Sequence, residues 1–370
     1  MEKPLFIKRK IDTKIQDYLK MPEILAIVGP RQAGKTTYLK NLCTIKNGLF
    51  ISFEDIDILN LFNNDIKSFA RTHVEGNDLI CIDEFQYAKN GGKNLKYLYD
   101  TYKNKKIIIS GSSVIDITIH AIKFLVGRVI VVNFWPFDID ELRIVFKNIN
   151  DAKLYEYYST FGGYPRVALA KDDDERKLIL KNIYNTYFLR EVKDILGLID
   201  EYKIEKLLMY IAQTVGSTIN YSKVANSCDI DERSVRKYIE FMNQTYVAYT
   251  CRPFFTNKLK EIVKQPKLYF YDNGFYNHVL GFDSLKGSKL EQTIVSELIK
   301  NNCDIKYWRT KAGSELDFVV YKDNKIVTAI EAKSSGMESK SYTDFNSMYK
   351  NITTQIIDQK NIFSILCQIK

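Results

Sequence analysis

The chain has 370 residues and a net charge of +9, with 45% hydrophobic and 27% charged residues. This length accommodates two or three domains with buried cores, and the composition is that of a soluble globular protein. No apolar run is long enough for a membrane span, and residues 1–10 lack the long apolar stretch of a secretory signal. We therefore expect a cytoplasmic protein without a membrane partner, whose positive charge permits nucleic acid or other anionic partners.

The cysteine and histidine positions argue against disulfides and zinc. Six cysteines lie far apart without a C-x-x-C pair, at positions 43, 81, 228, 251, 303 and 367. The three histidines, at positions 73, 120 and 278, have no metal-ligand spacing with them. The sequence predicts reduced and mostly buried thiols.

A phosphate-binding loop follows the first apolar run of the chain. Residues 24–28 suit a buried parallel strand, and residues 35–42 have helical spacing. Between them runs a complete G-x-x-x-x-G-K-T motif. The predicted nucleotide-binding residues are Gly29, Pro30, Arg31, Gln32, Ala33, Gly34, Lys35, Thr36 and Thr37. Lys35 would reach the β- and γ-phosphates at a helix N-terminus, and the Thr36 hydroxyl would bind Mg²⁺.

Two carboxylates end a second apolar run. Residues 79–82 predict a buried strand, and Asp83 and Glu84 emerge at its C-terminal end, where parallel α/β sheets bind ligands. Asp83 would hold the Mg²⁺ shell, and Glu84 would orient and deprotonate the attacking water. Alone the pattern is weak, but some fifty residues after a phosphate loop it favours an ATPase.

A third apolar run ends in hydroxyl groups. Residues 106–113 predict a strand whose serine could bond the γ-phosphate or the lytic water, with Ser112 preferred over Ser113. The alternative role of such a serine is to cap a helix. Arg128 precedes a further strand at residues 129–133. It either reaches the nucleotide of a neighbouring subunit or is an ordinary surface arginine.

These motifs together resemble a known family. The phosphate loop is followed in order by further matching segments: I-S-F-E-D at 51–55, D-E-F-Q at 83–86, S-G-S-S at 110–113, G-R at 127–128, W-P-F at 135–137 and G-G-Y-P at 162–165. Over nearly the whole chain they are similar to archaeal and bacterial ATPases of the AAA-14/DUF4143 type. The resemblance implies an α/β fold with a P-loop AAA+ (ASCE) core at residues 1–140, a parallel sheet in strand order 5-1-4-3-2, and a small helical lid. Arg128 falls where that superfamily often carries its arginine finger.

The middle of the chain is predicted to be helical. Residues 141–200 carry apolar and charged residues at helical spacing, and we interpret them as the lid. Residues 201–267 contain helical segments, a tight turn and then β-prone residues, which suggests a winged helix-turn-helix. If this module binds DNA, Arg233, Arg236 and Lys237 on its second helix would contact phosphates or bases. The alternative is a winged helix that packs only against protein.

Residues 268–370 predict an α/β domain with a charged strand face. Two strands around the turn at 322–324 form a hairpin, on which Asp317 faces Glu331 and Lys333. This resembles the PD-(D/E)XK core of restriction-endonuclease-like domains, and Glu291 matches the helical acid of that family. The resemblance implies a metal site at Glu291, Asp317 and Glu331, with Lys333 as a catalytic group. The bare spacing is weak, and nearby Arg309 and Lys311 could contact a nucleic-acid backbone.

We therefore expect an AAA+ ATPase that uses ATP and Mg²⁺ and is coupled to nucleic-acid binding. Its expected catalytic residues are Lys35, Glu84, Ser112, Arg128 and Lys333. DNA is the expected nucleic acid, and cleavage by the C-terminal domain, a homo-oligomer and a protein partner stay open. The alternative is a slow ATP-driven regulatory switch that binds a protein or DNA target and carries an inactive nuclease-like domain.

Overall fold

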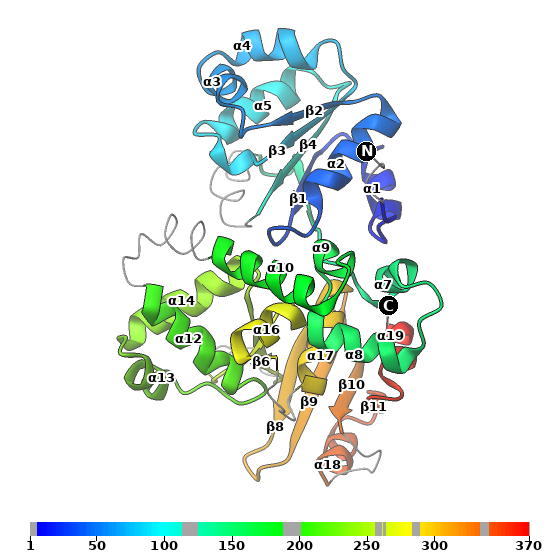
Figure 1. Ribbon diagram of the computed structural model, residues 1–370, viewed down its shortest axis with the longest axis vertical. Coiled ribbons are helices and arrows are strands. Elements are labelled where there is room, and N and C mark those ends of the chain that lie inside the picture. Colours follow the sequence, from blue (N-terminus) through cyan, green and yellow to red (C-terminus); the bar gives the residue numbers. More distant parts are fainter. Residues whose placement is uncertain are drawn as a thin grey trace. The chain divides into compact units, whose positions relative to one another are not determined.

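The chain forms two compact units in the computed structural model, Met1–Pro136 and Phe137–Lys370 (Figure 1). The structure describes residues 6–112, 125–187, 201–255, 261, 264–282, 289–333 and 340–369. The sequence predicts four segments, ending at residues 140, 200, 267 and 370. The observed boundary lies near the first of these, while the other three segments pack together as one unit.

The first unit is built on a five-stranded parallel sheet in the order β2-β3-β4-β1-β5. Its strands are β1 (Ile24–Val28), β2 (Leu49–Ser52), β3 (Leu79–Asp83), β4 (Lys106–Gly111) and β5 (Val129–Asn133). Read from the β5 edge, this is the order 5-1-4-3-2 expected for an AAA+ core. The strand at residues 24–28 is buried along its whole length, as its apolar run predicts.

Helices cover both faces of this sheet. They are α1 (Asp12–Tyr18), α2 (Lys35–Lys46), α3 (Ile56–Asn64), α4 (Ile66–Phe69) and α5 (Gly91–Thr101), with short helical turns at Ala70–Val74 and Phe85–Tyr87. In Figure 1, α1 and α2 lie on one face and α3 to α5 on the other. Leu39 and Leu42 of α2 pack with Leu25, Ile27 and Ile108 in the core, which fixes the helix that starts at the phosphate loop against the sheet.

The second unit combines many helices with a mixed sheet. Its helices are α7 (Ile139–Val145), α8 (Asp151–Phe161), α9 (Pro165–Ala168), α10 (Asp173–Thr186), α12 (Glu201–Gln213), α13 (Tyr221–Cys228), α14 (Glu232–Gln244), α16 (Asn273–Leu280), α17 (Lys289–Lys300), α18 (Lys340–Met348) and α19 (Ile362–Ile369). The expected lid is helical over its described residues, but α8 and α10 pack on α16, and α8 also packs on α17. These helices thus belong to the core of the second unit.

The strands of the second unit form one six-stranded sheet in the order β11-β10-β9-β8-β6-β7. They are β6 (Ala248–Pro253), β7 (Lys267–Phe270), β8 (Asp304–Arg309), β9 (Glu315–Lys322), β10 (Lys325–Ala332) and β11 (Thr354–Ile357). The hairpin expected around residues 322–324 is present as β9 and β10, with Asp323 and Asn324 at positive φ in its two-residue turn.

The segment expected as a winged helix has three helices followed by the antiparallel pair β6–β7. β6 also pairs with β8 at Arg252 and Pro253. The predicted wing is therefore continuous with the sheet of the following segment, which explains why residues 201–267 do not separate as a domain of their own. Their assignment as a winged helix stays a prediction.

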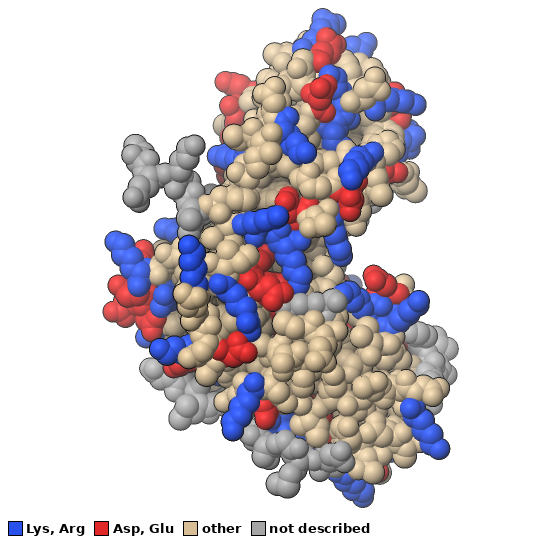
Figure 2. All heavy atoms as spheres, turned by 90° about the vertical axis from the view of Figure 1, so that its right-hand side faces the viewer, with Lys and Arg blue, Asp and Glu red and all other residues tan. Residues whose placement is uncertain are grey.

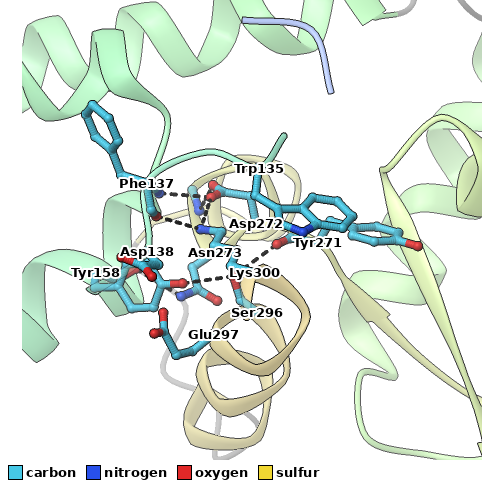
Figure 3. A network of polar contacts seen from close by, with 12 residues as sticks. Trp135, Phe137, Asp138, Tyr158, Tyr271, Asp272, Asn273, Ser296, Glu297 and Lys300 are labelled. Atoms are coloured by element: carbon cyan, nitrogen blue, oxygen red, sulfur yellow. Dashed lines mark hydrogen bonds and ion pairs between the residues drawn. The ribbon is translucent and has the colours of Figure 1, made fainter. Parts of the chain in front are cut away.

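A buried polar network lies at the start of the second unit (Figure 3). Lys300 pairs with Asp272 at 3.0 Å and donates to the carbonyl oxygen of Phe137 at 3.3 Å; both charged side chains are at most 3% exposed. Asp272 also accepts from the Gly163 amide at 2.9 Å. A Cβ on Gly162 would lie 2.0 Å from Asp272 Oδ1 and one on Gly163 2.0 Å from the Phe137 carbonyl oxygen, so both positions require glycine.

Two further expectations concern membranes and thiols. Within the described parts of the chain, no helix is both long enough and apolar enough to cross a membrane. All six cysteines are free thiols, and only Cys367 is exposed.

Candidate functional site

The phosphate loop connects β1 to α2 with the geometry that its motif predicts. Gly34 takes a left-handed conformation at φ 97° directly before α2, and Gln32 also has a positive φ. The loop begins tightly packed, because a Cβ on Gly29 would lie 2.1 Å from the carbonyl oxygen of Phe134. Lys35 is buried and donates to the carbonyl oxygens of Gly29 and Pro30, at 2.7 and 2.9 Å. Its ammonium thus lies over the loop.

Asp83 joins the loop to two neighbouring strands. Its Oδ2 accepts a hydrogen bond from the Thr36 hydroxyl at 2.5 Å, and its Oδ1 accepts one from the Ser110 hydroxyl. The carboxylate is 2% exposed, at the C-terminal ends of β3 and β4. A hydroxyl and a carboxylate are the oxygen donors that Mg²⁺ prefers, so Thr36 and Asp83 fit the predicted metal role.

Glu84 follows Asp83 in a left-handed conformation with φ 54°. Its carboxylate accepts a hydrogen bond from the Gln86 amide. Burial raises the pKa of Glu84 above its usual range and the Asp83 charge adds to this, while Lys35 and Arg31 act in the opposite direction. A carboxyl with a raised pKa beside a phosphate loop has the properties of a general base.

Ser112 and Arg128 are two further residues that the sequence predicts to be catalytic. Ser112 is buried directly after β4. Ser110, within β4, bonds Asp83, and Ser113 lies outside the described residues. Arg128 precedes β5, next to the first residue of β1, so it lies at the edge of the sheet opposite the phosphate loop. Its Nε is 3.3 Å from Asp100 Oδ1.

Arg9 is a contact of the phosphate loop that the motif analysis missed. Its guanidinium donates to the carbonyl oxygens of Ala33 and Trp135, at 3.1 and 2.6 Å, and lies 4.3 Å from the ring centroid of Phe134. The residue is 6% exposed. An arginine in a basic N-terminal stretch gives no local signal, because its partners are 24 and 126 residues away.

The predicted nucleic-acid face of α14 is partly engaged. Arg236 pairs with Glu232 at 2.6 Å and lies 3.7 Å from the centroid of the Tyr221 ring. Arg233 and Lys237 are exposed on the same side of the helix. Elsewhere, on the face drawn in Figure 2, basic side chains are interspersed with acidic ones over the described residues.

The charged residues of the nuclease-like prediction cluster around a lysine that it did not include. Lys267 is 2% exposed and lies 2.5 Å from Glu315 Oε1. Glu291 accepts from the Tyr269 hydroxyl at 2.9 Å, and Asp317 accepts from the Ala332 amide at 2.8 Å.

The other residues of the nuclease-like prediction lie at the ends of two strands: Glu331 and Lys333 at the end of β10, and Arg309 at the end of β8. Lys333 Nζ is 3.5 Å from Glu331 Oε1. Arg309 Nε is 3.6 Å from Glu315 Oε2. Among the described residues, no group of three or more His, Cys, Asp or Glu side chains is placed to hold a metal ion. The arrangement therefore differs from the expected metal site at Glu291, Asp317 and Glu331.

Comparison with protein families agrees with the first unit. Residues 21–143 match the family model described as an AAA domain. This part of the chain is similar to AAA domains. Residues 152–286 and 286–364 match two domains of unknown function, DUF8612 and DUF4143. Both parts of the AAA-14/DUF4143 resemblance are thereby confirmed, whereas the nuclease-like assignment is not shown.

Similar whole proteins are uncharacterised. A Haemophilus influenzae protein is 21% identical over 94% of this chain and 91% of its own length. A Methanocaldococcus jannaschii protein is 27% identical over 88% of this chain and 77% of its own.

Two solved structures align with TM-scores too low to support a conclusion about this chain. A signal transduction ATPase with numerous domains from Pyrococcus horikoshii has a TM-score of 0.33 and 14% identity, covering 81% of this chain. The chain spans only 45% of that protein. The Aeropyrum pernix ORC2 protein in its ADP form has a TM-score of 0.34 and 11% identity, covering 67% of this chain and 88% of its own.

Proposed function

We propose that the protein is a Mg²⁺-dependent ATPase whose turnover is coupled to nucleic-acid binding. The observation that carries the ATPase part is the hydrogen-bonded series Thr36–Asp83–Ser110 beside Lys35, at the C-terminal edge of the sheet. It joins the phosphate loop to the ends of β3 and β4 through the Asp83 carboxylate, within one unit. The AAA-domain match over residues 21–143 supports the same proposal.

The residues divide the reaction between them. The loop amides and Lys35 bind the phosphates, and Lys35 offsets charge on the β- and γ-oxygens. Thr36 and Asp83 would hold Mg²⁺, which when bound neutralises charge that develops on the phosphates. Glu84 accepts the proton of the attacking water as its oxygen bonds the γ-phosphorus and the bond to the β–γ bridging oxygen breaks. The products are ADP and inorganic phosphate.

Two substitutions test hydrolysis. We expect Lys35→Ala to abolish ATP binding, and Glu84→Gln to keep binding but lose about 100-fold or more in kcat, because the base is removed. Glu75→Gln, an exposed acid of the same unit, is the matched control and should behave as wild type. Turnover is measured as phosphate release and binding with a fluorescent ATP analogue. Wild-type turnover by Glu84→Gln would contradict the assigned role.

Coupling to nucleic acid is the second half of the proposal. It relies on Arg233 and Lys237 of α14, whose side chains are exposed and add positive charge to this helix. We expect Arg233→Ala/Lys237→Ala to weaken DNA binding at every sequence and to lower the salt slope of log K by about 2. Arg236→Ala is the control and should change binding less, since Arg236 is already paired with Glu232.

Fluorescence anisotropy with a short duplex at several salt concentrations measures these effects, alongside ATP turnover with and without DNA. DNA that neither binds nor stimulates turnover would favour the alternative, a slow switch that acts on a protein target. DNA cleavage is no part of the proposal, because the charged cluster around Lys267 does not fit the metal that cleavage would need.

A further inference from the structure

Lys267 occupies the centre of the charged cluster in the second unit. It comes from β7, while the carboxylates around it come from α17 and β9. Its side chain is 3% exposed and its Nζ is 2.5 Å from Glu315 Oε1. Burial by itself would lower the pKa of Lys267, but Glu291, Glu315 and Asp317 together raise it above its usual value. The carboxylates around Lys267 therefore favour its charged form.

The acids of the cluster are already bound to groups of the protein. Glu291 accepts from Tyr269, which shares a strand face with Lys267 because the two are two residues apart on β7. Asp317 accepts the backbone amide of Ala332. A buried carboxylate needs a counter-charge and hydrogen-bond donors, and here both come from the chain.

The same contacts connect segments that are distant in sequence. The loop that follows α12 pairs with β7, because Thr218 forms an antiparallel bridge with Lys267. Gly216, at φ 82°, lies so close that a Cβ there would be 2.7 Å from Glu291 Oε2. The cluster thus joins the loop after α12 and the strand β7 to α17 and β9.

We propose that Lys267 is the built-in counter-cation of this carboxylate cluster and excludes a divalent metal from it. The cluster then fastens the helical segment at residues 201–270 to the sheet at residues 304–333. It does not activate water for phosphodiester cleavage. This inference does not depend on whether ATP is hydrolysed.

Mn²⁺ binding to the full chain tests the proposal. Every protein carries Asp83→Asn, so that the ATPase site does not contribute, and free Mn²⁺ is measured by electron paramagnetic resonance without nucleotide. With Lys267 in place, Asp317→Asn should leave Mn²⁺ binding unchanged. Lys267→Ala should gain about one Mn²⁺ per chain, and Asp317→Asn should abolish that gain, because the vacated carboxylates then share a divalent ion.

Lys333→Ala is the matched control, since it removes a 30% exposed lysine that pairs with Glu331, and it should gain no site. Asp317-dependent Mn²⁺ binding with Lys267 present would overturn the proposal. So would a folded Lys267→Ala protein, checked by circular dichroism, that gains no site. If Lys267→Ala does not fold alone, Mn²⁺ should restore its folding, and failure to do so in both Lys267→Ala and Lys267→Met would count against the proposal.

Discussion

At the scale of single residues, buried cations organise this molecule. Arg9, Lys35, Lys267 and Lys300 are each at most 6% exposed. Each is held by carbonyl oxygens or carboxylates in the described structure. Because a buried cation is costly without such partners, each of these side chains fixes the backbone or acid that it contacts.

Arg9 is expected to act as a positioning residue for ATP binding. Arg9→Ala removes two hydrogen bonds from a charged donor, one of them to Ala33 in the phosphate loop, so the loop loses part of its preorganisation. We expect the KM for ATP to rise about tenfold while kcat changes little, because Glu84 is untouched. Steady-state phosphate release measures both parameters.

The control for Arg9 is Lys8→Ala, which removes a neighbouring but exposed cation and should leave KM unchanged. Arg9→Lys should restore part of the affinity, since an ammonium can still donate to a carbonyl oxygen. A fall in kcat with an unchanged KM would show that Arg9 does not act through the loop.

At the scale of elements, α17 connects two polar sites. Glu291 lies in its first turn, in the cluster around Lys267, and Lys300 ends it in the network of Figure 3. Glu297, between them, is fully buried and accepts from the Ile139 amide at 3.2 Å. The helix therefore links the first residues of the second unit to its charged cluster by a rigid path of about 14 Å.

Breaking the Lys300–Asp272 pair is expected to destabilise the second unit strongly. Lys300→Met leaves Asp272 buried without its cation, which costs about 3–5 kcal/mol. Lys300→Met/Asp272→Asn should cost less than the sum of the two single changes, because no lone charge remains. Urea unfolding followed by circular dichroism measures both.

An exposed ion pair of the same unit provides the comparison. Arg143 and Asp151 are 2.7 Å apart with side chains 42% and 55% exposed. Arg143→Met should cost only ~0–1 kcal/mol. Equal costs for the buried and the exposed pair would mean that the network is not a structural anchor.

At the scale of the whole molecule, the two units meet at consecutive residues. Arg9 holds the carbonyl of Trp135 at the end of the first unit, and Lys300 holds that of Phe137 at the start of the second. Within the first unit, Arg9 therefore connects the phosphate loop to the last residues before the unit boundary.

Arg128 lies too far from the phosphate loop of its own chain to contact a nucleotide bound there. The five residues of β5 separate it from the edge that carries the phosphate loop, roughly 16 Å at 3.3 Å per residue. We expect Arg128→Ala to keep wild-type ATP affinity and dilute-solution turnover. If turnover per chain of the wild-type protein rises with protein concentration, Arg128→Ala should lose that increase.

Mixing tests this role. In an oligomer that shares its sites, mixing Arg128→Ala with Glu84→Gln protein should restore the concentration-dependent turnover that each protein lacks alone, because one mixed interface has both groups. A loss of turnover in Arg128→Ala that is independent of concentration would instead assign Arg128 a role within its own unit.

The sequence by itself determined the phosphate-loop motif, the Asp83–Glu84 pair and the order of the strands that carry them along the chain. The phosphate loop and the Asp83–Glu84 pair are contiguous, and apolar runs before them predict parallel strands, whose carboxyl ends share one edge. Hydrophobic periodicity predicts the helices of the second unit, and turn residues predict its β9–β10 hairpin. Both signals come from residues that are close together in the sequence.

The tertiary structure alone decided which partners these residues meet. It brought Ser110 into contact with Asp83 and Arg128 into contact with Asp100, and it packed residues 137–370 into one unit. It also brought Lys267 and Arg9 to sites where no motif placed them. Such contacts join residues up to 126 positions apart, and the spacing of residues along a chain carries no signal for a pair that only packing brings together.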